Sequence, residues 1–321
     1  MRTILLQAGT LATNTVRDII RQPVILLLTT TAVVLIGLLP STAVFAFGEE
    51  ARLVRDGALA LNLVFGLLVA GAAAAATIYA EIKRGTAATV LCKPVSRSLY
   101  FISTYIGVLM VLLLFCATTL LAGLLSLRMV LPGMQTDGRI GALFLAAVSI
   151  AFGYAAISNF MFRRQFVSQA FIGLLPCLMV AFVAAAWIDP NGHAVRFGSL
   201  MAWQMVPAGI LVSLAVMVLA ALAVSLSTRL PPVLSTSACA AVFFLGLVSD
   251  YLLRAAAATS WWAASIYRLL PNWQDFWIVD ALSGGGNIPW GYVAASAGYA
   301  GLYAVAALAL GVLSFRRVEI L

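Results

Sequence analysis

The fold class of this chain follows most directly from a series of eight apolar runs, each about 20 residues or longer and almost free of charge. They occupy residues 23–47, 61–80, 99–125, 140–162, 166–187, 206–226, 233–253 and 290–315. Roughly 20 helical residues cross the hydrocarbon core of a bilayer, where every backbone polar group needs an internal partner. The sequence therefore predicts an all-α, polytopic integral membrane protein with about eight transmembrane helices in one transmembrane domain, residues 23–321.

The distribution of basic residues predicts an orientation. If the N-terminus is cytoplasmic, twelve of the nineteen Lys and Arg residues lie on the cytoplasmic side, and eight of the eleven Asp and Glu residues lie on the other. Short cytoplasmic segments of membrane proteins carry such an excess of Lys and Arg. We therefore expect a multi-pass protein of the cell inner membrane with both termini in the cytoplasm.

All seven tryptophans fall on the side predicted to be external, and four of them lie in the loop at 254–289. These four, expected at the outer membrane interface, are Trp261, Trp262, Trp273 and Trp277. Apolar residues recur in this loop at helical spacing, with Pro271 as a break. The pattern predicts short helices on the outer leaflet before the last span. They serve either as an anchor or as a lid over a substrate exit.

Residues 1–22 are too polar to span a bilayer but mix apolar and basic side chains. They predict an amphipathic helix along the inner membrane surface, with a frayed leader as the alternative. In the second span, the small residues of 66–80 predict close helix packing, either within the chain or at a subunit interface. Asp250 and Arg254, four residues apart, indicate a structural ion pair more readily than a proton relay.

Several kinds of chemistry lack the residues that they need. The single histidine, His193, has no cysteine near it, and the four cysteines are widely spaced, so the pattern favours neither a metal site nor a catalytic triad. The glycines at 284–286 precede no Lys-Ser or Lys-Thr, and no Walker A motif occurs. We expect no enzymatic activity in this chain, no cofactor bound by it and no nucleic-acid partner, since its basic residues lie between spans.

The segment at 81–97, EIKRGTAATVLCKPVSR, concentrates charge between the second and third spans. An acid and a basic pair extend the second span, Gly85 and Thr86 bend the chain, and Pro94 ends a short helix. A short helix held between two membrane helices moves when they move. This geometry suits the transfer of force from a cytoplasmic motor.

The order of residues in this segment resembles the coupling motif of ATP-binding-cassette (ABC) transporter permeases of the type-2 exporter family. Similar features are SLSTRLPPVLS at 225–235 and RLLPNWQDFWIVDAL at 268–282. The resemblance implies a coupling helix within 81–97 that docks on an ATPase subunit. The residues expected to couple are Glu81, Arg84, Gly85, Thr86, Val90, Leu91, Lys93, Pro94, Val95, Ser96 and Arg97. Many family members have six spans, whereas this chain has eight apolar runs.

By this resemblance the chain is the permease subunit of an ABC exporter, working as a homodimer or heterodimer in the membrane lipid. A separate nucleotide-binding subunit would hold ATP and Mg. Glu81 and Arg97 would act as polar contacts or helix-end anchors, and Val90, Leu91 and Val95 as the apolar contact. Two alternatives remain: an ion-coupled secondary transporter or channel that acts without an ATPase, and a membrane scaffold that transports nothing.

Overall fold

A computed structural model describes residues 2–42, 48–83, 96–131, 135–261, 264–265, 267, 270–282 and 286–316, without the side chains of 2, 3 and 252–259. Within this part of the chain, eight helices are long and apolar enough to cross a membrane. They are α2 (Pro23–Thr42), the continuous helix Glu50–Lys83, α6 (Arg97–Arg128), α7 (Gly138–Phe162), α8 (Phe166–Ala186), α9 (Met205–Leu226), α10 (Pro232–Thr259) and α12 (Trp290–Arg316). The predicted all-α class and the eight apolar helices are confirmed.

The second of these helices begins eleven residues earlier than the run predicted at 61–80. It comprises α3 (Glu50–Ala74), one turn of π-helix, η2 (Ala75–Tyr79), and α4 (Ala80–Lys83). In the added turns, Arg52 forms ion pairs with Glu49 at i−3 and Asp56 at i+4. Such pairs stabilise a helical turn that hydropathy alone excludes from the span.

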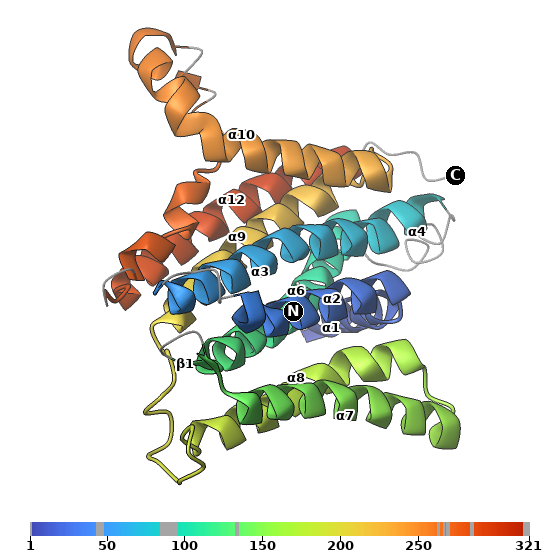
Figure 1. Ribbon diagram of the computed structural model, residues 1–321. Coiled ribbons are helices and arrows are strands. Elements are labelled where there is room, and N and C mark those ends of the chain that lie inside the picture. The colour runs from blue at the N-terminus through green and yellow to red at the C-terminus, as the bar shows by residue number, and fades with distance from the viewer. Residues whose placement is uncertain are drawn as a thin grey trace.

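The helices form a bundle with two distinct ends (Figure 1). One, here named the basic end, carries Lys83, Arg97, Arg229 and Arg316, and lies on the right of the view near α4. The other, the tryptophan end, carries Trp187, Trp203, Trp273, Trp277 and Trp290. In Figure 1, α7 and α8 form a pair at the bottom, α10 lies along the top, and α3, α6 and α9 lie between them.

Small residues of α3 pack inside the chain, as one of the two alternatives predicts. Ala70, Ala73 and Ala74 are fully buried. A Cβ atom on Gly66 would lie 2.6 Å from a methyl group of Val216 on α9, and one on Gly71 would collide with Thr236 on α10. The glycines therefore allow α3 to approach both neighbouring helices closely.

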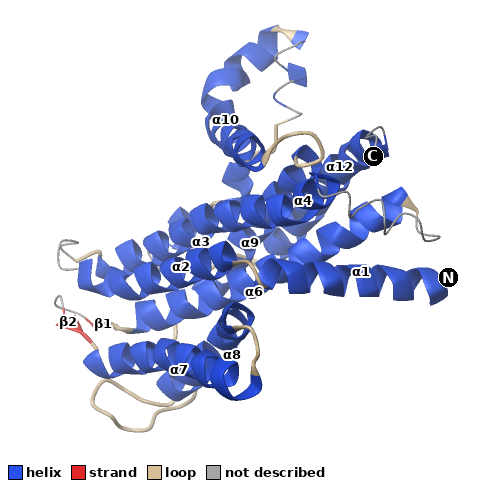
Figure 2. Cartoon of the chain, turned by 90° about the vertical axis from the view of Figure 1, so that its right-hand side faces the viewer, coloured by secondary structure: helices blue, strands red, loops and turns tan. Residues whose placement is uncertain are grey.

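The N-terminal helix α1 (Arg2–Ile20) extends away from the bundle, with the N-terminus at its far end (Figure 2). Its second half packs on the core through Ala12, Thr15 and Ile19, whereas Leu5 and Leu6 are exposed. The helix predicted for 1–22 is thus present. The second half of the helix is suited to contact with α6, and the exposed first half is suited to contact with lipid.

Replacement of Gly107 by Leu is expected to detach α1 from α6. A Cβ atom at Gly107 would lie 2.6 Å from the Thr15 Cβ and 2.8 Å from the Ala12 carbonyl oxygen, and the backbone oxygen belongs to a rigid helix. A cysteine at Thr15, buried in the native chain, should then react with a water-soluble maleimide. Gly141→Leu is the control, because nothing lies within 4 Å of its Cβ position. Equal labelling of the two variants would contradict this packing.

At the tryptophan end, a small sheet and a buried ion pair join neighbouring helices. Strands β1 (Val130–Leu131) and β2 (Gln135–Thr136) pair antiparallel between α6 and α7. Beside them, the guanidinium of Arg128 lies 3.6 Å from the carboxylate of Asp137, and both side chains are about 5% exposed or less. Arg128 also donates to the Ile188 carbonyl at 2.9 Å, so it joins α6 to the chain that leaves α8.

Candidate functional site

The ends of two core helices meet the predicted coupling segment at the basic end. The helix that contains α3 continues to Lys83, and α6 begins at Arg97, so thirteen residues connect two long helices. Glu81, Ser96 and Arg97 are described. The other eight residues expected to couple lie outside the described residues: Arg84, Gly85, Thr86, Val90, Leu91, Lys93, Pro94 and Val95.

The helix that leads into this segment contains an irregular turn. At η2 (Ala75–Tyr79), the hydroxyl of Thr77 donates to the carbonyl oxygens of Ala73 at 2.9 Å and Ala74 at 3.2 Å. Single π-helical turns inside α-helices often occur at functional sites. Glu81 follows this turn and is half-buried. The sequence pattern did not predict η2, because its residues are as apolar as the rest of the span.

Arg97 connects the start of α6 to the end of α12. Ser96 caps α6, since its hydroxyl accepts from the Leu99 amide at 3.2 Å. The Arg97 guanidinium donates to the Arg316 carbonyl at 3.0 Å, and Arg316 donates back to the Ser98 hydroxyl at 2.9 Å. A cation near a helix C-terminus also interacts favourably with the helix dipole. Each of the two helix ends therefore donates a hydrogen bond to the other.

The turn between α9 and α10 holds the same end of α12. The hydroxyls of Thr228 and Ser314 are 3.0 Å apart, and Arg229 donates to the Ser314 hydroxyl at 3.2 Å. Farther into the bundle, the hydroxyl of Ser225 on α9 donates to the Ala307 carbonyl on α12 at 2.8 Å. Sequence reasoning noted the stretch at 225–235 but missed its partner, because Ser314 is a single polar residue within an apolar span.

The predicted interfacial tryptophans differ in position. Trp261 is 83% exposed and Trp277 is half-buried, while Trp262 lies outside the described residues. Trp273 is only 2% exposed, and its ring centroid is 5.6 Å from that of Phe243 on α10. The expectation that Trp273 faces the membrane interface is corrected: it packs inside the protein. Asn272 caps the short helix η3 (Trp273–Phe276), in which Trp273 and Phe276 are both buried.

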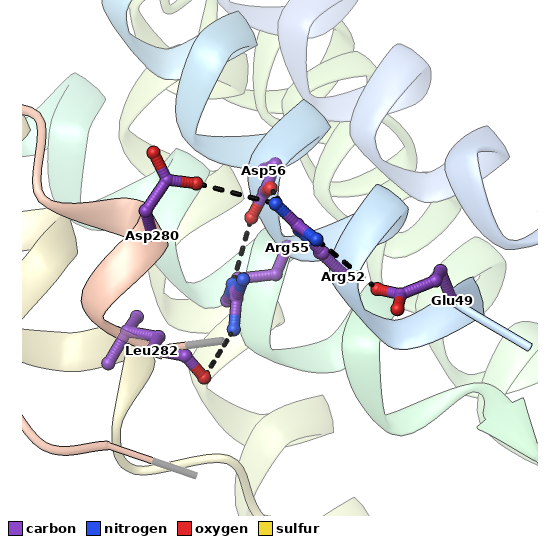
Figure 3. Close-up of polar contacts among 6 residues, drawn as sticks. All are labelled: Glu49, Arg52, Arg55, Asp56, Asp280 and Leu282. Atoms are coloured by element: carbon purple, nitrogen blue, oxygen red, sulfur yellow. Dashed lines mark hydrogen bonds and ion pairs between the residues drawn. The ribbon is translucent and has the colours of Figure 1, made fainter. Parts of the chain in front are cut away.

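A polar network fixes the loop that carries these rings to α3 (Figure 3). The Arg55 guanidinium donates to the Leu282 carbonyl at 3.1 Å and to Asp56 at 2.9 Å. Arg52 lies 3.4 Å from Asp280, which belongs to the short helix η4 (Val279–Leu282). Within η3, burial and the nearby carboxylate of Asp250 raise the pKa of Asp275. We call the contacts among Arg52, Arg55, Asp56, Asp280 and Leu282 the latch.

Other residues singled out from the sequence have ordinary surroundings. Asp250 accepts a hydrogen bond from the Tyr267 hydroxyl, and the side chain of Arg254, its expected partner, lies outside the described residues. His193 is exposed in the loop after α8, where its backbone amide donates to Asp189 at 2.7 Å and lowers the pKa of that carboxyl. Cys116 and Cys239 are buried.

The hydrogen bonds at the basic end thus join three chain segments: the start of α6, the turn between α9 and α10, and the end of α12. The end of α4 leads into the predicted coupling segment at the same end of the bundle. Comparison of the chain with family models and with curated protein sequences found no match to either.

Proposed function

We propose that this chain is the membrane-spanning permease subunit of an ABC exporter. It couples ATP hydrolysis by a separate ATPase subunit to transport across the inner membrane, as a homodimer or heterodimer. The basic end then faces the cytoplasm, where residues 81–97 contact the ATPase. The partner binds ATP and Mg, and this chain performs no covalent chemistry.

The observation that carries this proposal is the direct attachment of the predicted coupling segment to core helices at both of its ends. Helices are stiff, so a push on residues 84–95 displaces α3 and α6 together. The bond from Arg97 to the Arg316 carbonyl extends that displacement to α12. The π-helical turn η2 is a place at which α4, the last turn of the helix Glu50–Lys83, can shift relative to α3.

Replacement of Arg97 by Ala is expected to reduce transport-coupled ATP hydrolysis by roughly tenfold, the effect of losing one hydrogen bond from a charged donor. The ATPase would first be recovered by affinity purification of this chain from native membranes and identified by its Walker A motif. Hydrolysis is then measured in proteoliposomes that contain the complex. Glu81→Ala tests the other end of the segment and should uncouple transport or weaken recruitment of the ATPase.

Arg164→Ala is the matched control, since it removes a basic residue at the same end of the bundle, in the turn between α7 and α8. It should leave coupling unchanged. Wild-type recruitment and transport in both the Arg97 and Glu81 variants would refute the proposal. So would gradient-driven flux through the isolated chain without ATP.

A further inference from the structure

An apolar cavity of about 280 Å³ lies within this single chain, in the half of the bundle nearer the tryptophan end. Its walls come from three helices and include Ala60 on α3, Ala215 on α9 and Phe243 on α10, and the rings of Trp273 and Trp277 adjoin it from the loop beyond α10. All the side chains that line it are apolar. Its volume is close to the lower end of the range for small-molecule sites, about 300 Å³.

The cavity is closed at its base, which α9 forms, and open at one side, next to α3. The side chains at its base on α9, Val212 and Ala215, are at most 2% exposed, whereas Val64 on α3 is 52% exposed. In a membrane, that open side faces the hydrocarbon phase, because α3 is among the helices apolar enough to span. A hydrocarbon chain can therefore enter from the bilayer without crossing water.

A charged rim lies directly above the cavity on the same face of α3. Arg52, Asp56 and Ala60 are spaced by four residues, so Asp56 and Arg52 lie about 6 and 12 Å along the helix axis from the cavity wall. Both belong to the latch, which also fixes the loop that carries Trp273 and Trp277 (Figure 3). The same contacts thus hold the rings over the cavity and place charge at its mouth.

The rim has an excess of negative charge. The carboxylates of Glu49, Asp56 and Asp280 surround two guanidinium groups, and Asp280 is 88% exposed. Arg55 is 12% exposed and is already bonded to Asp56 and Leu282. An incoming ammonium group would balance the excess carboxylate, whereas an incoming anion would be repelled by it.

A second apolar hollow, between α7 and α8, provides an internal comparison. Its volume is about 290 Å³, and its lining includes Ala146, Ile150 and Val180. None of the described residues that line it is aromatic or charged, so it resembles an ordinary groove filled by lipid. The cavity at α3 differs in its aromatic rings and its charged rim.

We propose that the cavity at α3 binds the hydrocarbon chain of an amphiphile whose head group carries an amine. The chain packs between α3, α9 and α10 under the rings, and the ammonium group lies at the carboxylates of the rim. This inference rests on the proposed function in one respect: only if the chain is a permease is the bound amphiphile a transported substrate. Binding itself needs no ATPase. The binding test can therefore fail while the coupling test succeeds, and the coupling test can fail while binding is observed.

The test is photolabelling of the full-length chain in nanodiscs with a long-chain alkylamine that carries a diazirine in its chain. Labelled peptides from residues 60–64 and 243–247 are expected, and an excess of unlabelled alkylamine should remove the signal. A fatty acid with the same chain and diazirine should label these residues about fivefold less, the ratio expected for one exposed charge pair. Ala60→Phe should fill the cavity and abolish the labelling.

Ala146→Phe is the matched control, because it places the same ring in the hollow between α7 and α8. It should leave the labelling at α3 unchanged. Competition on the native chain tests the site even if Ala60→Phe fails to fold. Labelling that excess alkylamine does not reduce, equal labelling of both hollows, or stronger labelling by the fatty acid would each overturn the proposal.

Discussion

Replacement of Asp137 by Asn is expected to lower the free energy of unfolding by about 3–5 kcal/mol. The Arg128–Asp137 pair is almost fully buried, so removing one charge leaves the other without compensation. Asn retains an oxygen that can accept from the Arg139 and Ile140 amides, as Asp137 does, so the N-cap of α7 is kept. Reversible unfolding in mixed detergent micelles measures the change.

Two further variants isolate the cause of this loss. The double change Arg128→Met with Asp137→Asn should recover most of the stability, because neither charge then remains buried. Asp280→Asn should cost less than about 1 kcal/mol, because Asp280 is 88% exposed and its ion pair with Arg52 is solvated. A loss in Asp137→Asn no larger than that in Asp280→Asn would show that the buried pair contributes little.

Replacement of Phe315 by Ala is expected to cost on the order of 3 kcal/mol. Phe315 is 1% exposed, and its ring centroid lies 5.8 Å from that of Tyr100 and 5.9 Å from that of Phe101. Because lipid tails are as apolar as Phe, the loss comes from packing against α6 and not from transfer to water. The same unfolding measurement applies.

Phe160→Ala, on α7, is the control for this change. It removes the same ring from a position that is 88% exposed, and it should alter the free energy of unfolding by no more than about 0.5 kcal/mol. Similar losses in the two variants would mean that the ring matters for its hydrophobicity alone. The comparison therefore separates specific helix packing from partition into the membrane.

These two changes affect opposite ends of the bundle, which the structure stabilises by different means. At the tryptophan end, a buried ion pair and the latch fix the loops between helices. At the basic end, hydrogen bonds join helix termini that belong to α6, α12 and the turn after α9. The second arrangement is more exposed, because Arg97, Arg229 and Arg316 all lie at the surface.

Hydropathy was sufficient to predict the eight long apolar helices found among the described residues. Each of the eight runs must form a helix, because a bilayer offers its backbone no other partner. The boundaries were less accurate, as the start of α3 at Glu50 shows: hydropathy excludes Arg52 and Asp56, although their spacing of four residues suits an ion pair on a helix. The inward position of Trp273 was also missed, because periodicity gives a helix face without saying what that face contacts.

The amino-acid sequence alone was enough to predict eight apolar helices, close packing by the small residues at 66–80 and the concentration of charge at 81–97. These are local properties, set by the cost of placing polar groups in hydrocarbon. Three contacts emerged from the folded structure alone: Arg97 meets the end of α12, Arg128 pairs with Asp137, and rings from beyond α10 adjoin a cavity beside α3. In lipid such contacts depend on shape and hydrogen-bond geometry, which a one-dimensional pattern does not contain.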